Sequence, residues 1–177
     1  MMAACMFCNA ELPEGAAFCS SCGKKQVTRY TQTFRRGNMK EEDFINQINA
    51  WFAQYPQVAN VKGEFLLSHG VGMLVNKYVF DALSIEYEVL SGRNTNQYAV
   101  IQLSEFGFTR KDTSDLLSKW KAANPGATVV RTAGGVNQRG STGSLLVGGF
   151  GASNQAQLYV LFKFDRKNGT ALPSQNT

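Results

Sequence analysis

The sequence is poor in the residues that serve most enzymes and secreted scaffolds. It has one histidine, His69, and four cysteines in 177 residues, with no cysteine beyond Cys22. No apolar run approaches the ~20 residues of a membrane-spanning helix. The start of the chain lacks the basic and apolar segments of a secretory signal. We therefore expect no membrane span and a reducing, cytoplasmic setting.

The formal net charge of the chain is +5, and the segment from Gly23 to Lys40 contains no acidic residue. The rest of the chain, from Glu41 onward, has 12 basic and 11 acidic residues. The positive charge therefore belongs to one connecting segment. Interleaved with Tyr30 and Phe34, its cations suggest weak, sequence-independent nucleic-acid contact, whereas a solvated basic edge strand is the favoured alternative. The candidate contacts are Lys24, Lys25, Arg29, Arg35, Arg36 and Lys40.

The four cysteines form two C-x-x-C pairs, Cys5 with Cys8 and Cys19 with Cys22. Two such pairs at close spacing are typical of a tetrahedral zinc site with four thiolate ligands. Asn9 and Gly23 follow the pairs, where the turn needs a positive φ. Two disulfides, a thioredoxin-like motif and a rubredoxin-like iron site are the weaker alternatives. Since thiolates fill all four positions, we expect one structural zinc ion and no catalysis by it.

These residues carry a family resemblance. The segment from Cys5-Met-Phe-Cys8 to Phe18-Cys19-Ser-Ser-Cys22-Gly resembles the short zinc-ribbon module at the N-terminus of many bacterial proteins. The match covers about residues 4–26, and Asn9 stands where the module usually has glycine. The resemblance implies that Cys5, Cys8, Cys19 and Cys22 bind zinc, and it implies no activity.

Beyond the module the patterns predict two amphipathic helices. The first has an expected cap at Asn38 with Glu41, ends before Pro56, and repeats apolar residues at helical spacing: Phe44, Ile45, Ile48, Trp51, Phe52 and Tyr55. The second opens at Asp112 and is stopped by Asn124-Pro125-Gly126. Its expected inward residues are Leu116, Leu117, Trp120 and Ala123.

Alternating residues predict several strands in a mostly antiparallel sheet. They cover 61–67, a short 71–76, 78–90, 98–103, 128–132 and 157–164. His69 falls in an expected hairpin turn, and nothing supports a catalytic triad around it. Glu86 and Glu88 alternate on the face opposite the apolar one, where we expect solvated side chains.

Glycine is concentrated in 134–151, with seven glycines in 18 residues. This stretch resembles a P-loop, but Ser141 stands where the lysine is needed. We expect a long loop there, and a nucleotide-dependent or hydrolytic enzyme is the third functional alternative.

The two predicted helices echo each other. Trp51, Pro56 and Val61 repeat at the same spacing as Trp120, Pro125 and Val130, and Asp43 and Asp112 precede each tryptophan by eight residues. This pattern suggests a duplication or a pseudo-two-fold, with chance as the alternative.

The sequence thus predicts an α+β protein behind a zinc ribbon. The expected units are a ribbon over 1–26, a basic segment or edge strand over 27–40, an α+β domain over 41–167 and a disordered tail over 168–177. The leading functional hypothesis is a zinc-binding, non-enzymatic protein whose larger domain binds a protein. The oligomeric state is not determined by the sequence.

Overall fold

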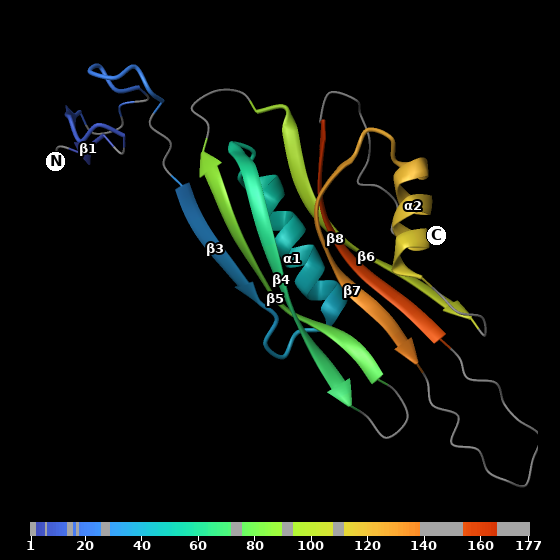
Figure 1. The fold of residues 1–177 in the computed structure, drawn as a ribbon. Coiled ribbons are helices and arrows are strands. Elements are labelled where there is room, and N and C mark those ends of the chain that lie inside the picture. The colour runs from blue at the N-terminus through green and yellow to red at the C-terminus, as the bar shows by residue number, and fades with distance from the viewer. Residues whose placement is uncertain are drawn as a thin grey trace, which may run out of the picture.

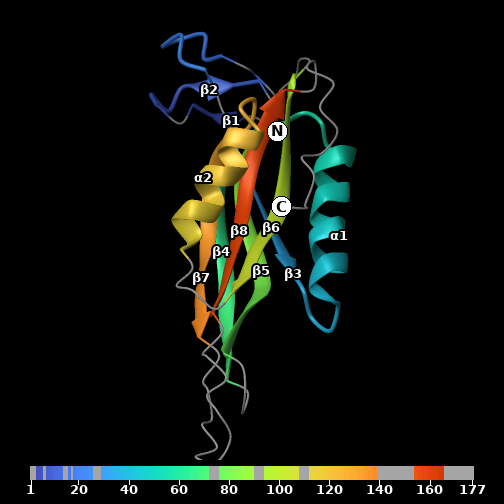
Figure 2. The ribbon, with the colours of Figure 1, turned by 90° about the vertical axis from the view of Figure 1, so that its right-hand side faces the viewer.

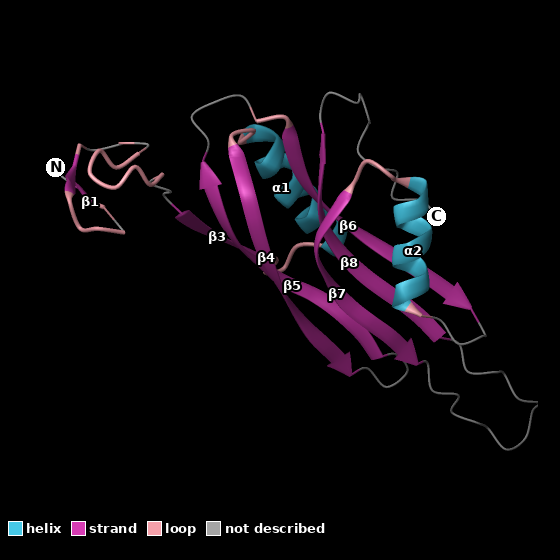
Figure 3. Ribbon diagram, turned by 45° about the horizontal axis from the view of Figure 1, so that its top comes forward, coloured by secondary structure: helices cyan, strands magenta, loops and turns pink. Residues whose placement is uncertain are grey.

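The computed structural model describes residues 3–5, 7–13, 16, 18–25, 29–71, 76–89, 94–107, 112–138 and 154–165 (Figures 1 and 3). The expected tail over 168–177 lies outside these residues. The elements follow in the order β1 (Ala3–Ala4), β2 (Glu11–Leu12), β3 (Arg29–Arg35), α1 (Glu41–Gln54), β4 (Val58–Val71), β5 (Asn76–Val89), β6 (Asn96–Gly107), α2 (Thr113–Ala123), β7 (Thr128–Gln138) and β8 (Asn154–Asp165). Neither helix is long and apolar enough to cross a membrane, within the described part of the chain.

The strands form three antiparallel sheets. β1 and β2 make a two-stranded sheet, β3-β5-β4 a three-stranded one, and β6-β8-β7 another. This arrangement confirms the predicted α+β class with two helices and antiparallel strands. The basic stretch Arg29–Arg35 is the edge strand of its sheet, paired along its whole length with β5.

The helices lie on opposite faces of the strand layer (Figure 2). α1 buries Phe44, Ile45 and Ile48 in a core that reaches both three-stranded sheets, from Phe80 of β5 to Tyr159 of β8. α2 covers only the β6-β8-β7 sheet, on the other face. As a result, the face of the β3-β5-β4 sheet away from α1 is exposed to solvent.

Under α2, Trp120 packs edge-to-face on Phe162 at 4.9 Å. Leu116 and Leu117 also face this core, as predicted, whereas Ala123 is exposed. Ala123 is the last residue of α2.

The two halves of the described fold repeat one plan. Each is a strand, a helix and two strands, and in each the last strand lies in the middle of its sheet. β4 and β7 lie side by side and run in the same direction (Figure 1). From the shared β4–β7 boundary outward, the strand order is β4-β5-β3 on one side and β7-β8-β6 on the other. With the two helices on opposite faces, this order corresponds to a pseudo-two-fold axis parallel to the strands. The fold therefore supports the duplication that the tryptophan spacing suggested.

The β-bulges give a second match. The pairing of β4 with β5 shifts between Ala59 and Lys62, and that of β7 with β8 shifts between Val129 and Arg131. Val61 and Val130, the residues of the sequence repeat, lie within these bulges. A bulge in the same place of both units indicates a shared design, since bulges are specific features of a strand.

One contact of α1 crosses from the first half to the second. The Asn49 side chain accepts from the Val100 N–H at 2.7 Å and donates to the Val100 carbonyl at 2.9 Å. β6 is an edge strand, so these groups have no neighbouring strand to bond. The carboxamide of Asn49 takes the place of a peptide group and closes the edge.

Replacing Asn49 with leucine should therefore cost about 2 to 4 kcal/mol, because two buried backbone groups lose their partners. Urea unfolding followed by tryptophan fluorescence measures the loss. The control is Asn46→Leu on the exposed side of the same helix, which should change stability by less than about 0.5 kcal/mol. Equal effects of the two variants would show that the edge contact contributes nothing.

Several strand predictions need correction. β4 continues through His69 to Val71, so His69 lies in a strand rather than a turn. Of the strand expected over 71–76, Val71 ends β4 and Asn76 begins β5, and 72–75 lie outside the described residues. His69 pairs there with Tyr78, which extends the hairpin beyond the alternating residues. In the glycine-rich stretch, 134–138 belong to β7, while 139–151 lie outside the described residues.

The predicted cap of the first helix is also wrong. Lys40 occupies the cap position of α1 and makes no side-chain capping bond. Glu41 instead accepts from the Phe80 N–H at 3.3 Å and from the Gln157 side chain at 3.3 Å. The Glu41 carboxylate thus bonds to groups of β5 and β8 instead of capping the N-terminus of α1. The second prediction holds, since Asp112 accepts from the Ser114 N–H at 2.9 Å.

Candidate metal centre

The first cysteine pair sits on a tight backbone turn. The Cys5 N–H donates to the Ala10 carbonyl at 2.8 Å, and the Asn9 N–H donates to the Cys5 carbonyl at 2.9 Å. Asn9 has a φ of 57°, which asparagine tolerates better than most residues. The Phe7 N–H points at the Cys5 sulfur at 3.4 Å. The turn therefore presents two sulfurs on one side.

The second pair repeats this turn fourteen residues later. The Cys19 N–H donates to the Lys24 carbonyl at 2.9 Å, and the Gly23 N–H donates to the Cys19 carbonyl at 2.9 Å. Gly23 has a φ of 66°. Phe18 bridges Lys25 just as Ala4 pairs with Glu11 in the first turn. The positive φ predicted after each pair is confirmed at both positions.

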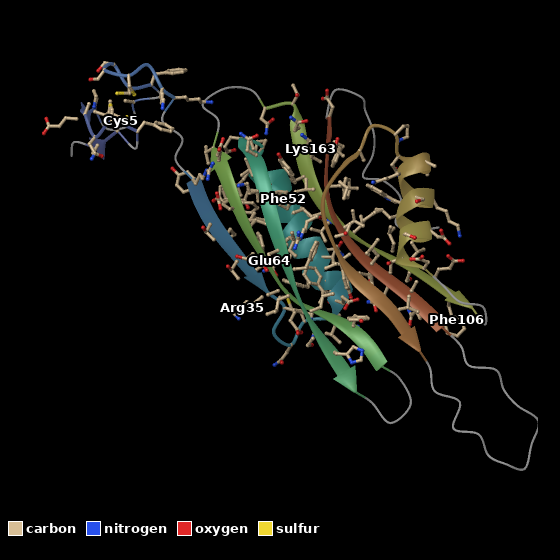
Figure 4. All side chains as sticks on the ribbon, in the orientation of Figure 1. Cys5, Arg35, Phe52, Glu64, Phe106 and Lys163 are labelled. Atoms are coloured by element: carbon tan, nitrogen blue, oxygen red, sulfur yellow. The ribbon has the colours of Figure 1, made fainter. Side chains whose placement is uncertain are left out.

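The two turns bring all four sulfurs together. The sulfurs of Cys5 and Cys22 are 3.7 Å apart, those of Cys8 and Cys19 are 3.6 Å apart, and all four lie within 4.8 Å of one another. Figure 4 shows the yellow sulfur atoms gathered at the Cys5 label. A tetrahedron with metal–sulfur bonds of ~2.3 Å has edges of about 3.8 Å. The cluster is therefore positioned to bind one metal ion.

The distances between the sulfur atoms also distinguish this site from a pair of disulfides. All four cysteines are free, with sulfur separations far above the ~2.05 Å of a disulfide. Cys5 and Cys19 are buried and pack with Leu12, whereas Cys8 and Cys22 are exposed. The apolar core of this module is thus very small.

Backbone groups favour the thiolate form in the buried cysteines. Burial works to raise the pKa of Cys5, but N–H groups of Phe7 and Cys8 outweigh it and lower this pKa to about 6. The N–H of Cys22 likewise lowers the pKa of Cys19. The thiolate is the form that binds metals, so these N–H groups favour metal binding by Cys5 and Cys19. In Cys8 the Ala10 N–H works to lower the pKa, but the neighbouring Cys5 thiol and burial raise it to about 12.

Three of the six predicted nucleic-acid contacts have an acidic or aromatic partner among the described residues. Arg29 pairs with Glu86 at 3.2 Å and Glu88 at 3.8 Å, and Arg36 pairs with Asp81 at 3.3 Å. Lys24 lies over the Phe7 ring at 4.7 Å. Lys25 and Lys40 are exposed, and so is Arg35. Nucleic-acid binding stays a prediction, with two of its arginines already engaged by acids.

Two other polar side chains singled out by the sequence, His69 and Glu88, have partners among the described residues. His69 is exposed and packs edge-to-face on Tyr78 at 5.1 Å. Glu88 accepts from the Asn60 side chain at 2.6 Å besides meeting Arg29.

Sequence reasoning missed a buried polar cluster. Gln157 donates to the Tyr159 hydroxyl and to Glu41, and both Gln157 and Tyr159 are fully buried. Burial, with the nearby Glu41 carboxylate, raises the pKa of Tyr159 well above its usual range. The only signal was a glutamine directly before the apolar run 158–162 of β8. The cluster joins the start of α1 to the central strand β8.

Comparisons with protein-family models, with curated proteins and with solved structures each give no match. The functional argument therefore rests on the geometry of the site.

Proposed function

We propose that this chain is a zinc-binding, non-enzymatic protein whose metal holds the N-terminal module in shape and whose α+β part binds another protein. The observation that carries the proposal is the set of four cysteine sulfurs within 4.8 Å. Four thiolates are the usual ligands of a structural zinc ion, and they leave no coordination position for a substrate.

The size of the module supports a structural role for the metal. Among its described residues, the buried apolar ones are Leu12 and two of the cysteines themselves, with Ala10 and Ala16 packed against them. A segment of ~25 residues cannot fold on so little apolar burial. Metal binding then supplies the folding free energy. Thiolate ligands also fit the reducing cytoplasm that we propose as the setting.

The first test is the metal content. Protein purified without added metal should contain one zinc ion per chain, measured by elemental analysis. Iron on four thiolates is the chemical alternative, and it would colour the protein and appear in the same analysis. Protein with intact thiols that holds no metal even after zinc is offered would refute the proposal.

The second test is the independence of the two parts. Removing residues 1–26 should leave the α+β part folded, because its core residues belong to α1, α2 and β3 to β8. Both tryptophans, Trp51 and Trp120, lie in that part. A chelator should therefore leave the thermal transition seen by tryptophan fluorescence within about 2 °C of its value for the untreated protein. A collapse of this transition on chelation would show that the metal supports the whole fold.

A further inference from the structure

The open edge of β3 differs from the edge that corresponds to it. The pseudo-two-fold relates β3 to β6. Thr31 of β3 is paired with Glu86 of the central strand β5, and Val100 of β6 is paired with Leu161 of the central strand β8, so Thr31 corresponds to Val100. Val100 has its outward N–H and carbonyl closed by Asn49. β3 is the outermost strand of its sheet in Figure 1. Among the residues that the structure describes, one of the two corresponding edges is thus closed by a helix side chain and the other is not.

The backbone of β3 is oriented to accept another strand. The Arg36 N–H points inward to the Asp81 carbonyl at 2.8 Å. Because successive peptide groups alternate along a strand, Thr31, Thr33 and Arg35 direct their N–H and carbonyl groups outward. The Thr33 carbonyl is met only by the side chain of the neighbouring Gln32, at 3.3 Å, among the described residues.

The side chains beside this edge define what fits. On the face away from α1, Arg35 is exposed, with no ion pair to any residue that the structure describes (Figure 4). Arg29 is on the same face. On the other face, Tyr30 stacks on Tyr87 at 5.6 Å and is still 44% exposed. Because Arg29 already pairs with Glu86 and Glu88, the edge offers the positive charge of Arg35 on one face and an aromatic surface on the other.

We propose that β3 binds an extended peptide as a fourth strand, with acidic residues on the face of Arg29 and Arg35 and apolar residues on the face of Tyr30. Strand addition takes its affinity from main-chain hydrogen bonds and its specificity from alternate side chains. This inference rests on the proposed protein-binding function and gives the chemistry of the partner.

A second copy of the chain fits the edge poorly in the register that pairs the whole of β3. In an antiparallel pair of β3 strands centred on Gln32, Arg29 of one copy would stand opposite Arg35 of the other, twice. Like charges directly opposite destabilise a strand pair. The arginines thus oppose self-association and favour an acidic strand.

The experiment titrates the full-length, zinc-loaded protein with a fluorescein-labelled peptide of about eight residues that alternates glutamate and valine. Fluorescence anisotropy should show saturable binding with a Kd below ~1 mM. In NMR spectra, the largest changes in backbone amide chemical shift should occur at Thr31, Thr33 and Arg35. A lysine–valine peptide of the same length should bind at least about tenfold more weakly.

Two variants identify the edge. Thr31→Pro removes one outward N–H without touching the ladder to β5, and should weaken binding about fivefold or more, whereas Thr31→Val should leave it within about twofold. Arg35→Glu is exposed and independent of the fold, and should weaken binding about tenfold. Tryptophan-fluorescence melting verifies that each variant is folded.

Three results would overturn the inference: no saturable binding, equal binding of both peptides, or a β3-dependent dimer by light scattering. Each can occur while one zinc ion per chain is found, so it would leave the zinc site of the proposed function standing.

Discussion

Replacing Cys19 with serine should empty the metal site and unfold the N-terminal module. The Cys19 sulfur is buried and lies 3.6 Å from that of Cys8, and its loss leaves three ligands around a very small core. Structural zinc sites contribute roughly 10 to 16 kcal/mol of apparent binding free energy, which is folding free energy for a module of this size. Elemental analysis should give a zinc content close to zero. In NMR spectra, the amide signals of residues 3–25 should lose their chemical-shift dispersion, as in an unfolded chain.

The matched control is Ser20→Ala, one residue along the same turn, where the side chain is exposed. It should retain one zinc ion per chain. Cys19→Ser protein that still held a full equivalent of metal after dialysis would mean that the four-sulfur cluster is not the site.

Replacing Gly134 with alanine should destabilise the α+β part by about 3 to 5 kcal/mol. Gly134 has a φ of 154°, and an added Cβ would lie 2.1 Å from the Gln157 carbonyl oxygen of β8. Backbone cannot move aside as a flexible side chain can, so overpacking and strain add together. Urea unfolding followed by tryptophan fluorescence should show a lower midpoint, with a similar slope.

Gly126→Ala is the control for this substitution. Nothing lies within 4 Å of the Cβ it would add, so stability should change by less than about 1 kcal/mol. If the two alanine variants unfolded at the same urea concentration, the close approach of β7 to β8 at Gly134 would be wrong.

The metal site could be predicted because its information is local. Two cysteine pairs, each followed by a residue that accepts a positive φ, contain nearly the whole geometry of the two turns. The helices were also local, since Trp51 and Trp120 lie on periodic apolar faces. In both cases the residues that determine the local structure lie close together in the sequence.

The remaining features depend on contacts far apart in sequence. Glu41 is a good capping residue by its position, yet it bonds Gln157, which lies in the last strand. The glycines at 134 and 135 read as a loop, but they are small because Gln157 and Tyr78 lie against them. Glycine is favoured in both settings, so the pattern alone selects the wrong one.

The Asn49 contact also bears on how the chain came to be. Under the pseudo-two-fold, the position in α2 that corresponds to Asn49 is Ser118, which is exposed. If a single ancestral unit had paired with its own copy, each helix would have closed the other's edge by the same residue. Once two copies share one chain, each position is inherited separately and can change alone. A single chain permits such an asymmetry between asparagine and serine, which two identical subunits would not have, and here it accompanies a helix α2 that packs on β6, β7 and β8 alone.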